Sequence, residues 1–152
     1  MEPAGRGPAS VTCRGSFKLA LAAERAIDLF TPEGERSWVE GWDPRYPASG
    51  ADENQPGTVF VTDGADGDVV WIVTHVSELE RHYARFDHRG TVGTVEVRCR
   101  GAGEATEVEV TYRLTAMTPD AAAELDRFAA SYDGMMAVWE AEIASALERR
   151  EP

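Results

Sequence analysis

The middle of the chain consists of short segments in which apolar and polar residues alternate, separated by turn-forming residues. Five such segments follow one another, "GTVFVT", "DVVWIVTHV", "ERHYARFD", "TVGTVEVRC" and "EATEVEVTYRLTAM", with "DGADGD", "HRG" and "GAGE" at their junctions. A period of two is typical of half-buried strands, and the short connections favour hairpins over crossovers. The pattern therefore predicts an antiparallel sheet.

The period of the apolar positions changes to three and four after residue 118. Thr118 and Pro119 predict a cap and a first helical residue, and the apolar positions that follow are Leu125, Phe128, Tyr132, Met135, Trp139, Ile143 and Leu147. The spacing predicts one amphipathic helix over about 119–149, roughly 45–50 Å long at 1.5 Å per residue. The preceding strand has a similar length, so the helix can lie along the whole sheet.

The first third of the chain predicts a strand near residues 11–20 and a short helix near 23–30. Thr31 and Pro32 predict the start of a second short helix, which Gly41 and Pro44 bring to an end. The segment "WVEGWDPRYP", residues 38–47, is expected to form an irregular edge strand before a polar loop at 46–57. Residues 1–10 are expected to be a disordered tail, and residues 11–150 a single domain.

The predicted fold class is α+β, a curved antiparallel sheet of six to seven strands wrapped around a long C-terminal helix, with two short helices after the first strand. With "LFTPEGERSWVEGWDPRYP", "VWIVTHV" and "YDGMMAVWEAEI", this order resembles the Bet v 1-like helix-grip arrangement of the START-like (SRPBCC) superfamily, and in particular its small bacterial polyketide cyclase/dehydrase-like proteins. The resemblance implies a cavity between sheet and helix. Its members mostly bind hydrophobic ligands and only some are enzymes, so it implies no set of catalytic residues.

Composition narrows the choice of partners. The chain has 152 residues, 43% of them hydrophobic, and a formal net charge of −12, which disfavours nucleic acid and anionic membrane surfaces as partners. No apolar run approaches the roughly 20 residues of a membrane span. Cys13 and Cys99 do not make a disulfide framework, so we expect free thiols and a cytoplasmic protein. The sequence leaves a homodimer open.

Candidate metal and nucleophile residues favour structural interpretations. Asp63, Asp66 and Asp68 predict a hairpin turn, because a calcium loop starting at either Asp63 or Asp66 would place an apolar residue or glycine at a required ligand position. The histidines, His75, His82 and His88, have no clear ligand spacing, and His88 falls in a turn. We expect no metal and no cofactor, and Cys99 is expected to be a small buried thiol.

Alternation predicts which side chains face a cavity. Val108, Val110, Tyr112, Leu114 and Ala116 are expected to face inward on the last strand, with Glu107, Glu109, Thr111 and Arg113 outward. The same rule turns Val95, Val97, Cys99 and Gly93 inward on the strand before it. On "ERHYARFD", His82, Ala84 and Phe86 are expected inside, with Arg81, Arg85 and Asp87 outside. The face of residues 68–77 that points inward stays open.

A two-residue turn at His88–Arg89 would set Ala84 opposite Gly93 and leave empty volume there, with the Tyr112 hydroxyl and the His82 imidazole as polar groups. Alternatively, Gly93 marks a β-bulge. Gly134 indicates close packing or free space beside the helix. The aromatic residues of the helix are core by default, yet some can line the cavity. The predicted ligand-binding residues are Trp42, Trp71, His82, Ala84, Gly93, Tyr112, Tyr132, Met135 and Trp139.

Three functions are consistent with this sequence. The first is binding of a hydrophobic small molecule, such as a lipid, polyketide or aromatic metabolite, as a carrier or sensor. The second is a polyketide cyclase/dehydrase-type enzyme whose catalytic residues the sequence does not identify, with a Tyr, His or Arg transferring protons. The third is a protein-interaction module, similar to a chaperone cofactor, with an exposed apolar patch and no cavity.

Overall fold

The computed structural model describes residues 9–64 and 67–150. Six antiparallel strands form one sheet in the order β1-β6-β5-β4-β3-β2. Their bounds are β1 Ser10–Leu19, β2 Val59–Gly64, β3 Gly67–Val76, β4 Glu80–Asp87, β5 Thr91–Ala102 and β6 Ala105–Ala116. Most of the predicted tail lies outside the described residues, and Ser10 already belongs to β1. The predicted sheet is confirmed.

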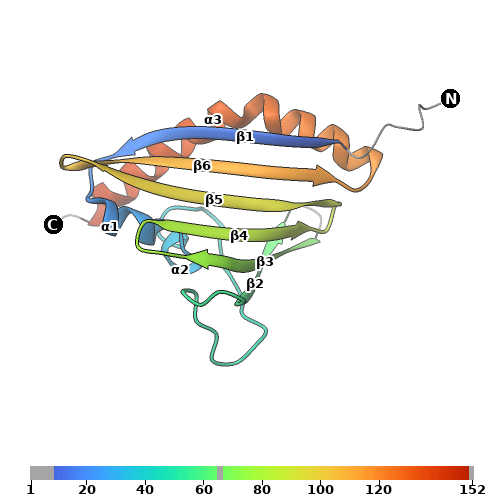
Figure 1. The fold of residues 1–152 in the computed structure, drawn as a ribbon, viewed down its shortest axis with the longest axis horizontal. Helices are drawn as coiled ribbons and strands as arrows, with labels where there is room; N and C mark the ends of the chain where they lie inside the picture. The colour runs from blue at the N-terminus through green and yellow to red at the C-terminus, as the bar shows by residue number, and fades with distance from the viewer. Residues whose placement is uncertain (1–8, 65–66, 151–152) are drawn as a thin grey trace.

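The long helix α3 (Pro119–Arg150) begins at the predicted cap, where the Ala121 amide donates to Thr118 Oγ1 at 3.1 Å. It runs along β1 and β6, as Figure 1 shows. The predicted first helix splits into one α-helical turn, α1 (Ala23–Ala26), and one 3-10 turn, η1 (Ile27–Phe30). The next helix is α2 (Pro32–Glu35), capped by Thr31 Oγ1, which accepts from the Gly34 amide at 2.9 Å. The predicted helix-and-sheet arrangement is confirmed.

The prediction of an edge strand at residues 38–47 is wrong. The segment is a series of turns with one isolated bridge between Arg45 and Val61, because Gly41 adopts φ +76° and two prolines interrupt pairing. Its two indole rings are anchored to backbone: Trp38 Nε1 donates to the Leu29 carbonyl and Trp42 Nε1 to the Pro32 carbonyl, both at 2.8 Å. Trp38 is buried and Trp42 half-buried.

The predicted facing of β5 and β6 is confirmed. Val95 pairs with Tyr112, Val97 with Val110 and Cys99 with Val108, and all six side chains are buried. On the opposite face of β6, Thr111 is also buried, although alternation predicts an exposed residue there. The open question about β3 is answered as well, because Val69 and Val73 are buried while Ile72 is exposed.

The predicted facing of β4 is wrong. Asp87 pairs with Thr91, so the turn holds three residues, His88 to Gly90, and not two. Gly90 adopts φ +101°, as three-residue hairpin loops commonly require. Since side chains alternate with a period of two, this one-residue difference reverses the whole strand. Arg81, Tyr83, Arg85 and Asp87 therefore face inward, while His82, Ala84 and Phe86 face outward, with Phe86 50% exposed.

Two predictions about glycines also change. Gly93 pairs in regular register with Arg85 and Leu114, so it is not a bulge; the register shift of the sheet lies in β3, between Val73 and His75. A Cβ at Gly93 would lie 1.8 Å from the Arg113 carbonyl oxygen, so glycine permits a close strand approach. Gly134 is exposed with no atom within 4 Å of a built Cβ, so close packing does not explain it.

Candidate functional site

A partly enclosed cavity of about 170 Å³ lies between the sheet and the first half of α3. Its apolar wall is formed by Tyr112 and Leu114 from β6 and by Leu125 and Phe128 from α3. An apolar cavity of about 150 Å³ suffices to bind benzene. The space is therefore about the size of one aromatic ring.

Tyr112 lies at the centre of an aromatic group that joins β6 to α3. Its ring centroid is 5.1 Å from that of Phe128, 5.9 Å from Tyr132 and 6.5 Å from Trp139. The Tyr132 hydroxyl donates to the Val110 carbonyl at 2.7 Å, which fixes the helix against the sheet. Burial is the main cause that raises the pKa of Tyr112 to about 12, so its hydroxyl is neutral at physiological pH.

The polar end of the cavity is formed by Arg85 and Asp87 from β4 and by Thr91 from β5, with Arg89 and Glu124 beside them. The Arg85 side chain is only 15% exposed; its Nη2 donates to Asp87 Oδ2 at 3.4 Å, and its guanidinium carbon lies 5.1 Å from the Trp71 ring centroid. Its Nε is buried and has no hydrogen-bond partner among the described residues. Arg85 is therefore held between Asp87 and Trp71, and its Nε–H is a buried donor without an acceptor among the described residues.

A second titratable group lies inside the molecule, at the end of α2. Glu35 is half-buried, and desolvation of its carboxyl group raises its pKa from the ordinary 4.5 to about 8. It influences the sheet opposite, because the Glu35 charge contributes to the raised pKa values of Tyr83 on β4 and Tyr112 on β6, where burial is the main cause. Glu35 thus lies among α2, β4 and β6 and is neutral at pH 7.

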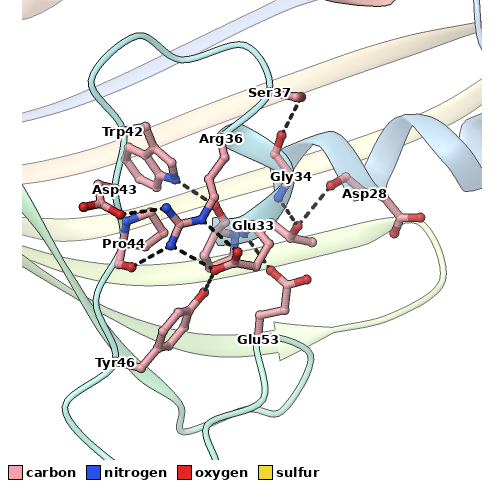
Figure 2. Close-up of polar contacts among 12 residues, drawn as sticks. Asp28, Glu33, Gly34, Arg36, Ser37, Trp42, Asp43, Pro44, Tyr46 and Glu53 are labelled. Atoms are coloured by element: carbon pink, nitrogen blue, oxygen red, sulfur yellow. Dashed lines mark hydrogen bonds and ion pairs between the residues drawn. The ribbon is translucent and has the colours of Figure 1, made fainter. Parts of the chain in front are cut away.

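Figure 2 shows the polar contacts that hold Glu33 and Arg36 on the other side of this helical turn from Glu35. Glu33, two residues earlier and so on the other side of the helical turn, accepts from Arg36 Nε at 2.8 Å and from the Tyr46 hydroxyl at 2.5 Å. Arg36 also donates to Asp43 Oδ1 and to the Pro44 carbonyl. Since this network fixes one side of α2 to the segment that follows, the opposite side, with Glu35, faces the interior.

A more open surface groove of about 560 Å³ adjoins this network, between α1, α2 and residues 53–54. Its lining includes Glu33 and Glu53, but Glu33 already binds Arg36 and Tyr46, and Glu53 Oε1 accepts from the Glu33 amide at 2.9 Å. The groove is thus formed by groups that stabilise the fold, and the cavity at Tyr112 is the better candidate site.

Of the predicted ligand-binding residues, Tyr112 lines the cavity, and Tyr132 and Trp139 pack against its ring. Met135 packs against the core. Trp71 and Trp42 belong to a second aromatic group around Phe60, where Trp71 stacks on Phe60 at 5.7 Å and lies 5.9 Å from Trp42. Trp71 meets the site only through Arg85.

Two predicted site residues point away from the interior, and Gly93 lies beside the cavity without lining it. Ala84 pairs with Thr94 and not with Gly93, and the His82 imidazole lies 2.9 Å from Glu80 Oε1 on the outer face. The Tyr112 hydroxyl therefore lies near Arg85 and not near His82. Sequence reasoning missed Arg85 and Glu35. A three-residue turn ending in Gly90 would have indicated Arg85, whereas no pattern indicates Glu35.

Other expected features can be located directly. Both cysteines are free and buried. Asp63 pairs with Asp68 in the predicted β2–β3 hairpin, while Asp66 lies outside the described residues. In the described part of the chain, no three His, Cys, Asp or Glu side chains come together as metal ligands. Similarly, no helix within residues 9–64 and 67–150 is long and apolar enough to cross a membrane.

Comparison with known proteins identifies the architecture. No family model and no curated protein matches the sequence. Protein MLL2253 of Mesorhizobium loti matches with a TM-score of 0.69 at 13% identity, over 93% of this chain and 100% of that one. Norcoclaurine synthase of Thalictrum flavum matches with a TM-score of 0.69 at 8% identity, over 96% and 98%.

DynU16, from the dynemicin biosynthetic locus, matches with a TM-score of 0.64 at 17% identity, over 93% of this chain but 48% of its own. The chain has the Bet v 1-like helix-grip fold. At these identities the likeness extends to the helix-grip fold alone, so function has to be argued from the cavity.

Proposed function

We propose that the protein binds a small apolar molecule, about the size of one aromatic ring, between the sheet and α3, as a cytoplasmic carrier or sensor. The observation that carries this proposal is the cavity of about 170 Å³ with Leu114, Leu125 and Phe128 on its wall and Arg85 at its polar end. Apolar walls with a few polar groups are typical of small-molecule sites. One norcoclaurine synthase structure contains dopamine and hydroxybenzaldehyde, two molecules of this size class.

The test is titration of the protein with ethylbenzene, followed by NMR of the leucine, isoleucine and valine methyl groups. We expect saturable shifts at Leu114 and Leu125, which line the cavity, and none at Val59 and Ile72, which are exposed on the outer face. Leu125→Phe should fill the space and weaken binding at least about tenfold, at a cost in stability of about 1–3 kcal/mol.

Phe86→Ser is the matched control, because it removes an exposed apolar side chain of the outer face and should leave ethylbenzene binding unchanged. Shifts confined to Val59 and Ile72 would contradict the proposal. They would instead favour the protein-interaction module, since Val59, Ile72 and Phe86 form an exposed apolar group on adjacent strands.

A second candidate function is a cyclase- or dehydrase-type enzyme. It is favoured by a titratable carboxyl, Glu35, close enough to Tyr112 to influence its pKa, and by Arg85, which lines the cavity together with Tyr112. A general acid or base needs a pKa near the working pH, and the pKa of Glu35, raised by burial to about 8, meets this requirement. Binding remains the first proposal, because it needs only the cavity.

A further inference from the structure

Three polar groups around Tyr112 have no hydrogen-bond partner among the described residues. The Arg85 Nε–H is buried and unpaired. Tyr83 donates to the Phe30 carbonyl and Tyr132 to the Val110 carbonyl, whereas the Tyr112 hydroxyl has no such bond. The Glu35 carboxyl, too, has neither a hydrogen bond nor an ion pair with the described residues. They come from β4, β6 and α2 and act on one another at Tyr112.

All three groups are hydrogen-bond donors at neutral pH. The guanidinium has no acceptor, the Tyr112 hydroxyl is neutral, and burial raises the pKa of Glu35 to about 8, so that its carboxyl carries a proton. A buried donor without an acceptor is destabilising, and proteins rarely retain one without a reason. Among them, the Tyr112 hydroxyl and the Arg85 guanidinium line the same cavity, so a molecule bound there can supply the acceptor.

We infer that the bound molecule carries an acceptor oxygen on its apolar body, a carbonyl or a carboxylate, which accepts hydrogen bonds from a donor site formed by the Tyr112 hydroxyl and the Arg85 guanidinium, both of which line the cavity. The inference rests on the proposed function and names the chemical class of its ligand. Asp87 accepts from Arg85 Nη2, and the other N–H groups of the guanidinium remain for the ligand oxygen.

The donor site has a predicted pH dependence. When Glu35 ionises, a negative charge appears beside Tyr112, and an acceptor oxygen is repelled. The other charged or titratable groups around Glu35 and Tyr112 come from every neighbouring element: Arg81, Tyr83, Arg85 and Asp87 on β4, Cys13 on β1, Glu124 and Tyr132 on α3, and Tyr46, Glu53 and Arg89 in the loops. Among these, burial raises the pKa values of Tyr46 and Tyr83 above the ordinary 10 of tyrosine. Weakening of binding through about pH 8 is therefore ascribed to Glu35.

The experiment compares four molecules of one size, ethylbenzene, acetophenone, benzoate and benzylammonium, by the same methyl-shift titration at pH 6.5 and pH 9. At pH 6.5 we expect acetophenone and benzoate to bind about tenfold more tightly than ethylbenzene, the value of one or two net hydrogen bonds, and benzylammonium to bind least. At pH 9 the advantage of the two oxygen ligands should shrink.

Three variants assign the effect. Tyr112→Phe should abolish most of the preference for acetophenone and benzoate over ethylbenzene. Glu35→Gln should keep that preference but make it independent of pH. Tyr46→Phe is the control, because its hydroxyl binds Glu33 on the outside of α2, and it should leave both unchanged. If Tyr112→Phe fails to fold, the comparison of the four ligands at two pH values still tests the inference in the unmodified protein.

Each outcome is decisive. If all four molecules bind equally, or benzylammonium binds best at pH 6.5, the donor site is wrong while the proposed cavity function stands. If none of the four shifts Leu114 or Leu125, the proposed function itself fails and the inference falls with it. A preference for acetophenone over benzoate, or the reverse, identifies a neutral carbonyl or a carboxylate as the source of the acceptor oxygen.

Discussion

Glu35 ends a four-residue helix, and its half-buried carboxyl group is desolvated. In the unfolded chain its pKa is near the ordinary 4.5, and in the folded protein burial raises the pKa to about 8. Between these values the folded state binds one proton more than the unfolded state. The contribution of Glu35 to the free energy of unfolding is therefore greatest below about pH 4.5, and it is lost as pH rises from there through about 8.

The corresponding prediction concerns Glu35→Gln. In the unmodified protein, ionisation of Glu35 should lower the free energy of unfolding by up to about 1.4 kcal/mol per pH unit between roughly pH 5 and pH 8. The variant should lack this decrease. Urea unfolding of both proteins at pH 5, 6, 7 and 8 measures it, since only the difference between the two curves reports on Glu35. Parallel curves would mean that the carboxyl is solvated in solution.

A single residue such as Glu35 is the hardest feature to predict from sequence. The Thr31–Pro32 start signal predicts the helical turn correctly, but glutamate in a first turn is ordinarily exposed. Its burial follows from the contacts of Glu33 and Arg36 with residues 43–46, which no local pattern encodes. Tyr112, by contrast, could be placed correctly, because strict alternation over β6 determines its face.

Strand β5 contains two glycines in very different surroundings. A Cβ at Gly93 would meet the Arg113 backbone at 1.8 Å, whereas one at Gly101 meets nothing within 4 Å. We therefore expect Gly93→Ala to lower the free energy of unfolding by about 2–4 kcal/mol, and Gly101→Ala to change it by less than about 0.5 kcal/mol. Thermal unfolding of the two variants checks this, and equal effects would show that the strands can separate at Gly93 without cost.

Strand boundaries and faces differ in how far they can be predicted. The sequence predicts residues 80–87 as a strand, in agreement with β4, because alternation is a local signal. Its facing depends on whether the loop after Asp87 has two residues or three, and "HRG" permits both. The longer loop turns Arg85 into the cavity and His82 out of it. Most of the difference between the predicted site residues and the lining of the candidate cavity originates at that turn.

The two cysteines lie on different strands, so their reactivity reports on the stability of the whole sheet. Cys13 lies on β1 opposite Tyr112, and Cys99 on β5 opposite Val108, so that β6 separates them. Two strand spacings and four residues along β6 place them about 16 Å apart, far beyond the reach of a disulfide. Both are buried, and burial raises the pKa of Cys99 to about 12, so reactive thiolate is scarce until the sheet opens.

We therefore expect an aromatic disulfide reagent to modify Cys99 of a Cys13→Ser variant slowly in native buffer and rapidly in denaturant. Strand β5 lies inside the sheet, between β4 and β6, so the logarithm of the native modification rate should fall linearly as the free energy of global unfolding rises. Pretreatment of the protein with a reductant should not change this rate. A bound cavity ligand should slow it further, since the ligand stabilises the folded state alone. Fast modification that is unaffected by ligand would mean that β5 opens locally, apart from the cavity and the helix that covers it.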